Sequence, residues 1–99
     1  MPKRDAGWNL AGFEEHLERW IQQESPSEDV RFAVASWLLS RIEDPYHGMR
    51  REPEGHPNLW FGMVPGTLQG HEAVYCSYLI FERTGTVRCN SVTTLSWPA

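Results

Sequence analysis

The sequence of 99 residues predicts one α+β domain over residues 1–99, with an N-terminal helix pair packed on one face of a small antiparallel meander sheet of about three strands. Three observations predict this class. Apolar residues recur at helical spacing in residues 9–43, β-branched and aromatic residues dominate residues 73–96, and a short apolar run lies between them. Because a hairpin alone is barely stable in water, we expect the helices to cover the sheet.

Residues 1–8 are expected to be frayed, and an amphipathic helix is expected over about residues 9–23. Apolar residues recur there three or four positions apart, with charged residues between them, which is typical of a helix with one face in the core. These apolar positions are Leu10, Phe13, Leu17, Trp20 and Ile21. The pattern therefore predicts a helix that packs against the sheet.

A second helix is expected over about residues 26–43, with Ser25 as its N-cap and Pro26 in the first helical position. Apolar side chains wrap more than half of its surface. We therefore expect it to be covered on two sides, by the first helix and by the sheet. Asp44-Pro45 ends the helix, because a residue that precedes proline disfavours helical backbone.

The second half of the chain predicts strands joined by loops that are rich in proline and glycine. The expected segments are a loop over 45–57, a strand over 58–64, a loop over 65–72, and a hairpin with strands over 73–81 and 86–95. Side chains alternate between the two faces of a strand. Arg88, Asn90, Val92 and Thr94 are therefore expected to share one solvated face, away from the helices.

The formal net charge of −4 is unevenly distributed. Residues 1–44 hold nine acidic and five basic residues, whereas residues 45–99 hold four of each, so the acidity lies on the predicted helices. A protein that binds nucleic acid through its phosphates normally carries a basic excess. The local basic spot here is the pair Arg50-Arg51, and two glutamates follow it closely.

Cys76 and Cys89 are the two cysteines of the chain. A hairpin turn centred on Thr84-Gly85 places Cys76 opposite Thr93, too far from Cys89 for a disulfide. We expect free, largely buried thiols, which suit a reducing cytosol. The N-terminus shows no apolar signal segment, and no run is long enough to span a bilayer, so a cytoplasmic protein without a membrane partner is expected.

Three segments resemble the RelE/ParE superfamily of bacterial toxins: Asp44-Pro45 after the helix pair, Asn58-Leu59-Trp60 at the first meander strand, and the hairpin from Tyr75 to Arg88. The similarity covers about residues 10–96. It implies the toxin of a toxin–antitoxin pair, which acts on translation by mRNA cleavage or on a topoisomerase, with an antitoxin lying on the sheet and helices. Family members usually begin with a strand, for which Gly7-Trp8-Asn9 leaves little room.

If the chain cleaves RNA, its catalytic residues are predicted to be Arg50, Arg51, His56 and Arg88. Such cleavage needs a base for the 2′-hydroxyl, a cation for the developing charge and an acid for the leaving oxygen. Arginine supplies the cation, and histidine exchanges protons near neutral pH. No metal or cofactor motif is present, so the reaction would be that of a metal-independent endoribonuclease. The sequence leaves open that all four residues are ordinary solvated side chains.

The alternative is a non-catalytic protein-binding module on the same fold. The ribonuclease branch of the family has Arg or Lys early in the penultimate strand, where this chain has Tyr75 and Cys76. That branch ends its last strand with basic, His or Tyr residues, where this chain has Thr93, Thr94 and Ser96. A third hypothesis is a small-molecule enzyme that uses the 46–57 loop as a lid. Homo-oligomerisation is also left open.

Overall fold

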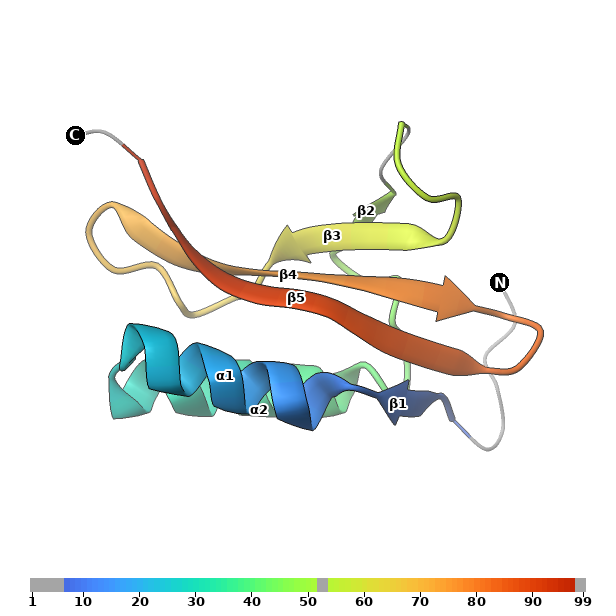
Figure 1. The fold of residues 1–99 in the computed structure, drawn as a ribbon, viewed down its shortest axis with the longest axis horizontal. Helices are drawn as coiled ribbons and strands as arrows, with labels where there is room; N and C mark the ends of the chain where they lie inside the picture. Colours follow the sequence, from blue (N-terminus) through green and yellow to red (C-terminus); the bar gives the residue numbers. More distant parts are fainter. Residues whose placement is uncertain (1–6, 52–53, 98–99) are drawn as a thin grey trace.

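The computed structural model describes residues 7–51 and 54–97, which form two helices and a five-stranded sheet. The elements, in chain order, are β1 (Asn9–Ala11), α1 (Phe13–Glu24), α2 (Glu28–Ser40), β2 (Arg50–Arg51), β3 (Leu59–Met63), β4 (Glu72–Phe81) and β5 (Thr86–Ser96). Both helices lie on the same side of the sheet (Figure 1). The α+β class and the helix pair on one face are therefore confirmed.

The sheet is larger than predicted and is mixed. Its strand order is β1-β5-β4-β3-β2, with β1 parallel to β5 and the other neighbours antiparallel. The three central strands are the expected meander, and the edge strands β1 and β2 are additional. Each edge strand is too short to show an alternating pattern. Main-chain bonds position β1, as when the amide of Asn9 donates to the carbonyl of Gly85 at 2.8 Å.

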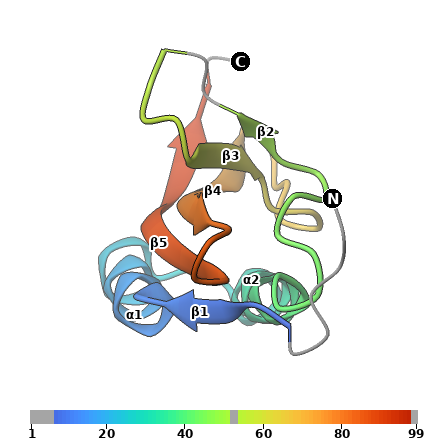
Figure 2. The same cartoon turned by 90° about the vertical axis from the view of Figure 1, so that its right-hand side faces the viewer.

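The segment before α1 is fixed where fraying was expected. Trp8 is buried, its amide donates to the carbonyl of Ile42 at 2.8 Å, and its ring meets Tyr46 edge-to-face at 5.9 Å. Residues 9–11, which the helical pattern included, form β1, the edge strand beside β5, and the chain passes from β1 directly into α1 (Figure 2). The rest of the expected frayed segment, residues 1–6, lies outside the described residues.

The predicted cap between the helices is displaced by two residues. Ser25 ends α1 instead of starting α2: its φ is 45° and its amide donates to the carbonyl of Ile21 at 3.0 Å. Ser27 is the N-cap of α2, where its Oγ accepts from the amide of Val30 at 3.3 Å. α2 ends at Ser40, earlier than predicted, and residues 41–43 form a turn before Pro45.

The core lies between the helices and one face of the sheet. Phe13, Trp20, Val30, Val34 and Leu38 from the helices meet Val74, Cys76, Tyr78, Ile80, Val87 and Cys89 from the sheet. Tyr78 is fully buried at its centre, with the Phe13 ring 5.9 Å away. Both cysteines are free and buried, as predicted. Among the described residues, no helix is both long and apolar enough to cross a membrane.

A β-bulge in β5 changes the register that simple alternation predicts. Ser91 pairs with Ser77 and Cys89 pairs with Tyr78, so Asn90 is an extra residue on β5. After the bulge, the β5 residues that simple alternation places on the outer face lie on the helix side instead. Thr94 lies on the helix side, where its Oγ1 accepts from the Trp20 indole at 2.9 Å. The prediction that Arg88 and Thr94 share a face is therefore wrong, and Cys76 pairs with Val92 instead of Thr93.

Candidate functional site

The sheet face that α1 and α2 do not cover is the principal candidate surface, and we call it the open face (Figure 1). Its side chains alternate with the buried ones along the three central strands. The open face comprises Leu59, Phe61 and Met63 of β3, Tyr75, Ser77 and Leu79 of β4, and Arg88, Asn90, Ser91 and Thr93 of β5. Met63 is 44% exposed, and Phe61, Tyr75 and Leu79 are half-buried.

A small polar group lies at the centre of the open face. The hydroxyls of Ser77 and Ser91 are 2.6 Å apart, and the amide group of Asn90 donates to the Ser77 hydroxyl at 2.9 Å. The bulge makes this group, because it places two successive β5 residues beside one β4 residue. Phe61 and Leu79 lie next to it. The surface therefore combines apolar area with hydrogen bonds that are already made within the protein.

Arg50 and Arg88 lie on the open face but far apart. Arg88 is exposed, and both of its chain neighbours are buried, so it points away from the helices as predicted. Arg50 lies on β2, where it pairs with Phe61 of β3, and β2 is three strands away from β5. Neighbouring strands are about 4.8 Å apart, so the two backbones are separated by roughly 14 Å across the sheet. The side chains of Arg50 and Arg88 therefore project from strands on opposite sides of the apolar residues of β3 and β4.

Arg51 belongs to the other face of the sheet. As the next residue of β2 it pairs with Trp60, and it lines an open groove of about 840 Å³ at the sheet edge. Tyr46, Glu82 and Arg83 line the same groove, and the Tyr46 hydroxyl donates to the Glu82 carboxylate. Burial, followed by this bond to Glu82, raises the pKa of Tyr46 above its ordinary value. Arg50 and Arg51 therefore cannot act on one bound group from the same side.

His56 is exposed in the loop that leads into β3. Its Nδ1 accepts a hydrogen bond from the backbone amide of Asn58 at 3.1 Å, so this nitrogen is engaged within the loop. Tyr78 carries a hydroxyl that could also exchange protons, but it lies in the core and donates to the carbonyl of Pro45. Burial raises the pKa of Tyr78, and Arg41 opposes this in part. Tyr78 is thus a structural residue. None of the three predicted catalytic arginines is adjacent to His56 in the sequence.

Sequence reasoning missed Arg41, which is the buried arginine of the helix side. It is 4% exposed, its Nη1 donates to the carbonyl of His47 at 2.6 Å, and its guanidinium stacks on Trp37 at 4.5 Å. It ties the end of α2 to the loop before β2. Its sequence signal is slight, because an arginine at the end of a helix is normally solvated.

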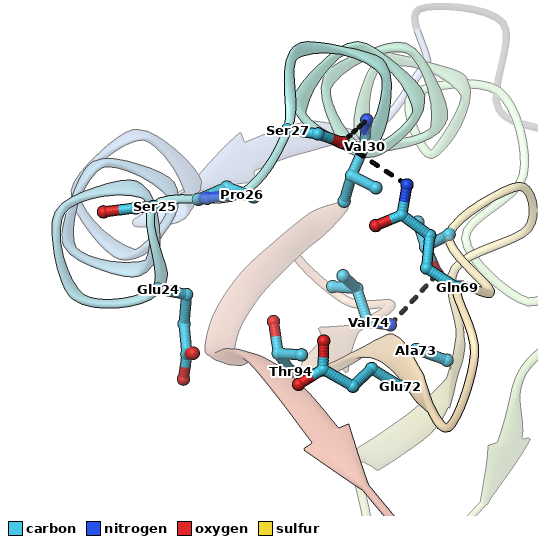
Figure 3. A pocket seen from close by; sticks show the side chains of 11 residues that line it. Glu24, Ser25, Pro26, Ser27, Val30, Gln69, Glu72, Ala73, Val74 and Thr94 are labelled. Atoms are coloured by element: carbon cyan, nitrogen blue, oxygen red, sulfur yellow. Dashed lines mark hydrogen bonds between the residues drawn. The ribbon is translucent and has the colours of Figure 1, made fainter.

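A second, smaller pocket of about 180 Å³ lies where the α1–α2 connection meets the β3–β4 loop (Figure 3). The carboxylates of Glu24 and Glu72 and the hydroxyl of Thr94 line it, while Val30 and Val74 form its apolar part (Figure 3). Across its rim, the Gln69 amide reaches the Ser27 hydroxyl at 3.5 Å. In residues 7–51 and 54–97, no group of three or more His, Cys, Asp or Glu side chains is placed to hold a metal ion.

Comparison with known proteins gives one informative match. No protein-family model matches the chain, and no curated protein matches it. Among solved structures, the fold is similar to that of the E. coli toxin RelE in the free state, determined for a mutant with two arginines replaced by alanine. The TM-score is 0.59 at 17% sequence identity, over 88% of this chain and 82% of that one. The chain therefore has a RelE-like fold, and the predicted resemblance is confirmed at that level.

Proposed function

We propose that this protein is the toxin-like component of a toxin–antitoxin pair and that it acts by binding a protein through the open face. The RelE-like fold supports the first part. The observation that carries the second part is the composition of the open face, where Phe61, Tyr75 and Leu79 gather while the arginines stand apart. Its proposed partners are an antitoxin and a target in translation or a topoisomerase.

The open face has the properties of a protein-binding surface. Contiguous apolar area is unusual on a protein surface that meets only water. Aromatic side chains are the commonest anchors of protein interfaces, and Phe61 and Tyr75 would supply them. The Ser77, Ser91 and Asn90 side chains already bond to one another, so a partner that covers the two hydroxyls covers hydrogen bonds that are made within the protein.

The same geometry gives little support to RNA cleavage. A general base and a cation must both reach the reacting phosphate, at hydrogen-bond distances. Arg50 and Arg88 are separated by two intervening strands, and Arg51 lies on the opposite face. One observation keeps a second candidate function, a metal-independent endoribonuclease: Arg50 and Arg88 do share the open face and flank the surface on which an RNA strand would lie.

Expression in a bacterial host tests the proposal through growth arrest. The intact protein is expected to arrest growth, and so is the triple variant Arg50→Ala/His56→Ala/Arg88→Ala, because the proposed binding depends on the apolar side chains of the open face and the two arginines lie at its margins. Phe61→Ser/Leu79→Ser is expected to abolish arrest, because both substitutions remove apolar contact area from the open face. Circular dichroism of each purified variant controls for loss of the fold. Arrest that the triple variant abolishes would favour the ribonuclease instead.

A further inference from the structure

The open groove that Arg51 lines is a second candidate binding site, which the proposed function does not use. Its volume is about 840 Å³, and it lies where β2, the start of β3 and the end of β4 meet. Its lining includes Tyr46 of the loop after α2, Trp60 of β3, and Ile80 of β4, which is 2% exposed. Trp60 pairs with the buried Tyr78, so the groove is on the helix side of the sheet. Clefts of this size with an apolar wall and a few polar groups are typical sites for small organic ligands.

The aromatic wall of the groove is already held in place. The Tyr46 ring meets Trp8 and Trp60 edge-to-face, with ring centroids 5.9 Å and 5.0 Å away. Its amide donates to the Asp44 carboxylate at 3.0 Å, and its hydroxyl donates to Glu82. Because these contacts fix the ring, a ligand does not have to order it on binding. Trp60 is half-buried, so an aromatic ligand can continue the same series of ring contacts.

Two arginines bring positive charge to the groove. Arg51 extends from β2 and Arg83 from the turn between β4 and β5, and both are exposed. Within residues 7–51 and 54–97, neither guanidinium has a hydrogen bond or an ion pair with another side chain. A guanidinium presents a planar fork of donors that fits the two oxygens of a carboxylate. The donors of both arginines are therefore available to a ligand.

Glu82 limits the charge of the ligand that the groove fits. Its carboxylate accepts from the Tyr46 hydroxyl, and burial together with this bond raises the pKa of Tyr46, so the hydroxyl keeps its proton near neutral pH. The charged residues of the described lining are the two arginines and this glutamate, so positive charge is in excess by one. A ligand with one negative charge balances this set. A doubly charged phosphate ester would bring like charge close to Glu82, and an amine would meet both arginines.

We propose that this groove binds a small aromatic carboxylate. The ring of the ligand packs against Trp60 and Tyr46, and its carboxylate accepts hydrogen bonds from Arg51 and Arg83 at the rim. The groove and the open face lie on opposite sides of the sheet. The proposal goes beyond the proposed function and does not depend on it.

Isothermal titration calorimetry with matched small molecules tests the chemistry of the ligand. Phenylacetate and indole-3-acetate are expected to bind the intact protein, and their neutral amides are expected to bind about tenfold more weakly or less, because the amides lose the charge-assisted hydrogen bonds. Butyrate, which has a carboxylate but no ring, is expected to bind more weakly than either acid. Tryptamine, which has the ring with a positive charge, is expected not to bind.

Variants of the groove test its position. Arg51→Ala/Arg83→Ala is expected to weaken the binding of indole-3-acetate about tenfold or more. The matched control is Arg50→Ala/Arg88→Ala, which removes the same charge from the open face and is expected to leave this affinity unchanged. Circular dichroism of each variant controls for loss of the fold. Glu82→Gln keeps an acceptor for the Tyr46 hydroxyl but removes the negative charge, and it is expected to bind indole-3-acetate more tightly.

Several results would overturn the proposal. They are no binding of either acid, equal binding of the acids and their amides, and unchanged affinity in Arg51→Ala/Arg83→Ala. Tighter binding of a tripeptide that ends in tryptophan would also overturn it, because the groove would then be assigned to the C-terminus of a protein. Growth arrest by open-face variants is measured separately, so either proposal can fail without the other.

Discussion

The two faces of the sheet share the same strands but have different environments. On β4, Cys76 and Tyr78 are at most 1% exposed beneath the helices, while Tyr75, Ser77 and Leu79 between and beside them form the open face. One face is filled by aromatic and branched side chains from α1 and α2. The other holds apolar side chains that are half-buried or exposed and that neither helix covers. The comparison teaches that one set of alternating residues sustains the fold and the other is available to a partner.

Two tyrosines of β4 give the largest expected difference between the faces. Tyr78→Ala is expected to cost about 3–5 kcal/mol of unfolding free energy, because it leaves a large cavity beneath the helices. Tyr75→Ala, three residues earlier and half-buried, is expected to cost about 1 kcal/mol or less. Urea unfolding of both variants measures this. Equal losses would show that the open face is packed as tightly as the core.

Gly62 tests how closely the helix side is packed at the β2–β3 edge. A Cβ at this position would lie 2.7 Å from the Met49 sulfur and 3.0 Å from the carbonyl oxygen of Gly48. Gly62→Ala is therefore expected to destabilise the protein by about 1–3 kcal/mol, as overpacking usually does. Met63→Ala, the next residue and 44% exposed on the open face, is the control in the same urea assay. A neutral Gly62→Ala would mean that the Met49 side chain moves aside freely.

The Tyr78 hydroxyl predicts a pH dependence that is confined to the helix side. Tyr78→Phe loses the bond to the Pro45 carbonyl and is expected to cost about 1 kcal/mol near neutral pH. Burial raises the pKa of Tyr78, so its contribution is complete below its unfolded pKa of about 10 and is lost as the pH rises above that. Unfolding free energy measured from pH 8 to 12 should fall less steeply in Tyr78→Phe. Parallel curves would contradict the buried hydroxyl.

The smallest expected effect comes from the open-face cations. Arg50→Ala/Arg88→Ala is expected to change the unfolding free energy by about 0.5 kcal/mol or less, because both side chains are exposed. Thermal unfolding measures this difference. A larger loss would mean that either arginine has a structural role, and the double variant would then be unsuitable for testing function.

The sequence predicted the parts of the fold that rest on long periodic segments. Helical spacing from Phe13 to Trp20 was sufficient for α1, and the β-branched and aromatic residues of 73–81 were sufficient for β4. It missed β1, because three residues show no period and a parallel partner 77 positions away in sequence stabilises them, as with Asn9 and Thr86. It also assigned the N-cap of α2 to Ser25, whereas α1 extends to Glu24, Ser25 ends it, and Ser27 is the cap.

The candidate site was less predictable than the fold. Arg88 was placed correctly on the outer side, but the bulge at Asn90 exchanged the faces that followed it, and a bulge leaves no simple pattern in sequence. The open face itself had a usable signal, because Tyr75 and Leu79 alternate with residues of the core. The roles assigned to Arg50, Arg51, His56 and Arg88 depend on side chains that meet across strands, which chain order alone does not show.

The most direct test of the central claim, binding by the open face without catalysis, is incubation of the purified protein with labelled mRNA, with and without ribosomes, followed by gel analysis. The account predicts that the RNA stays intact while the protein still arrests growth in cells. Cleavage products that disappear in Arg50→Ala/Arg88→Ala would contradict it, and would instead assign the open face to an RNA substrate.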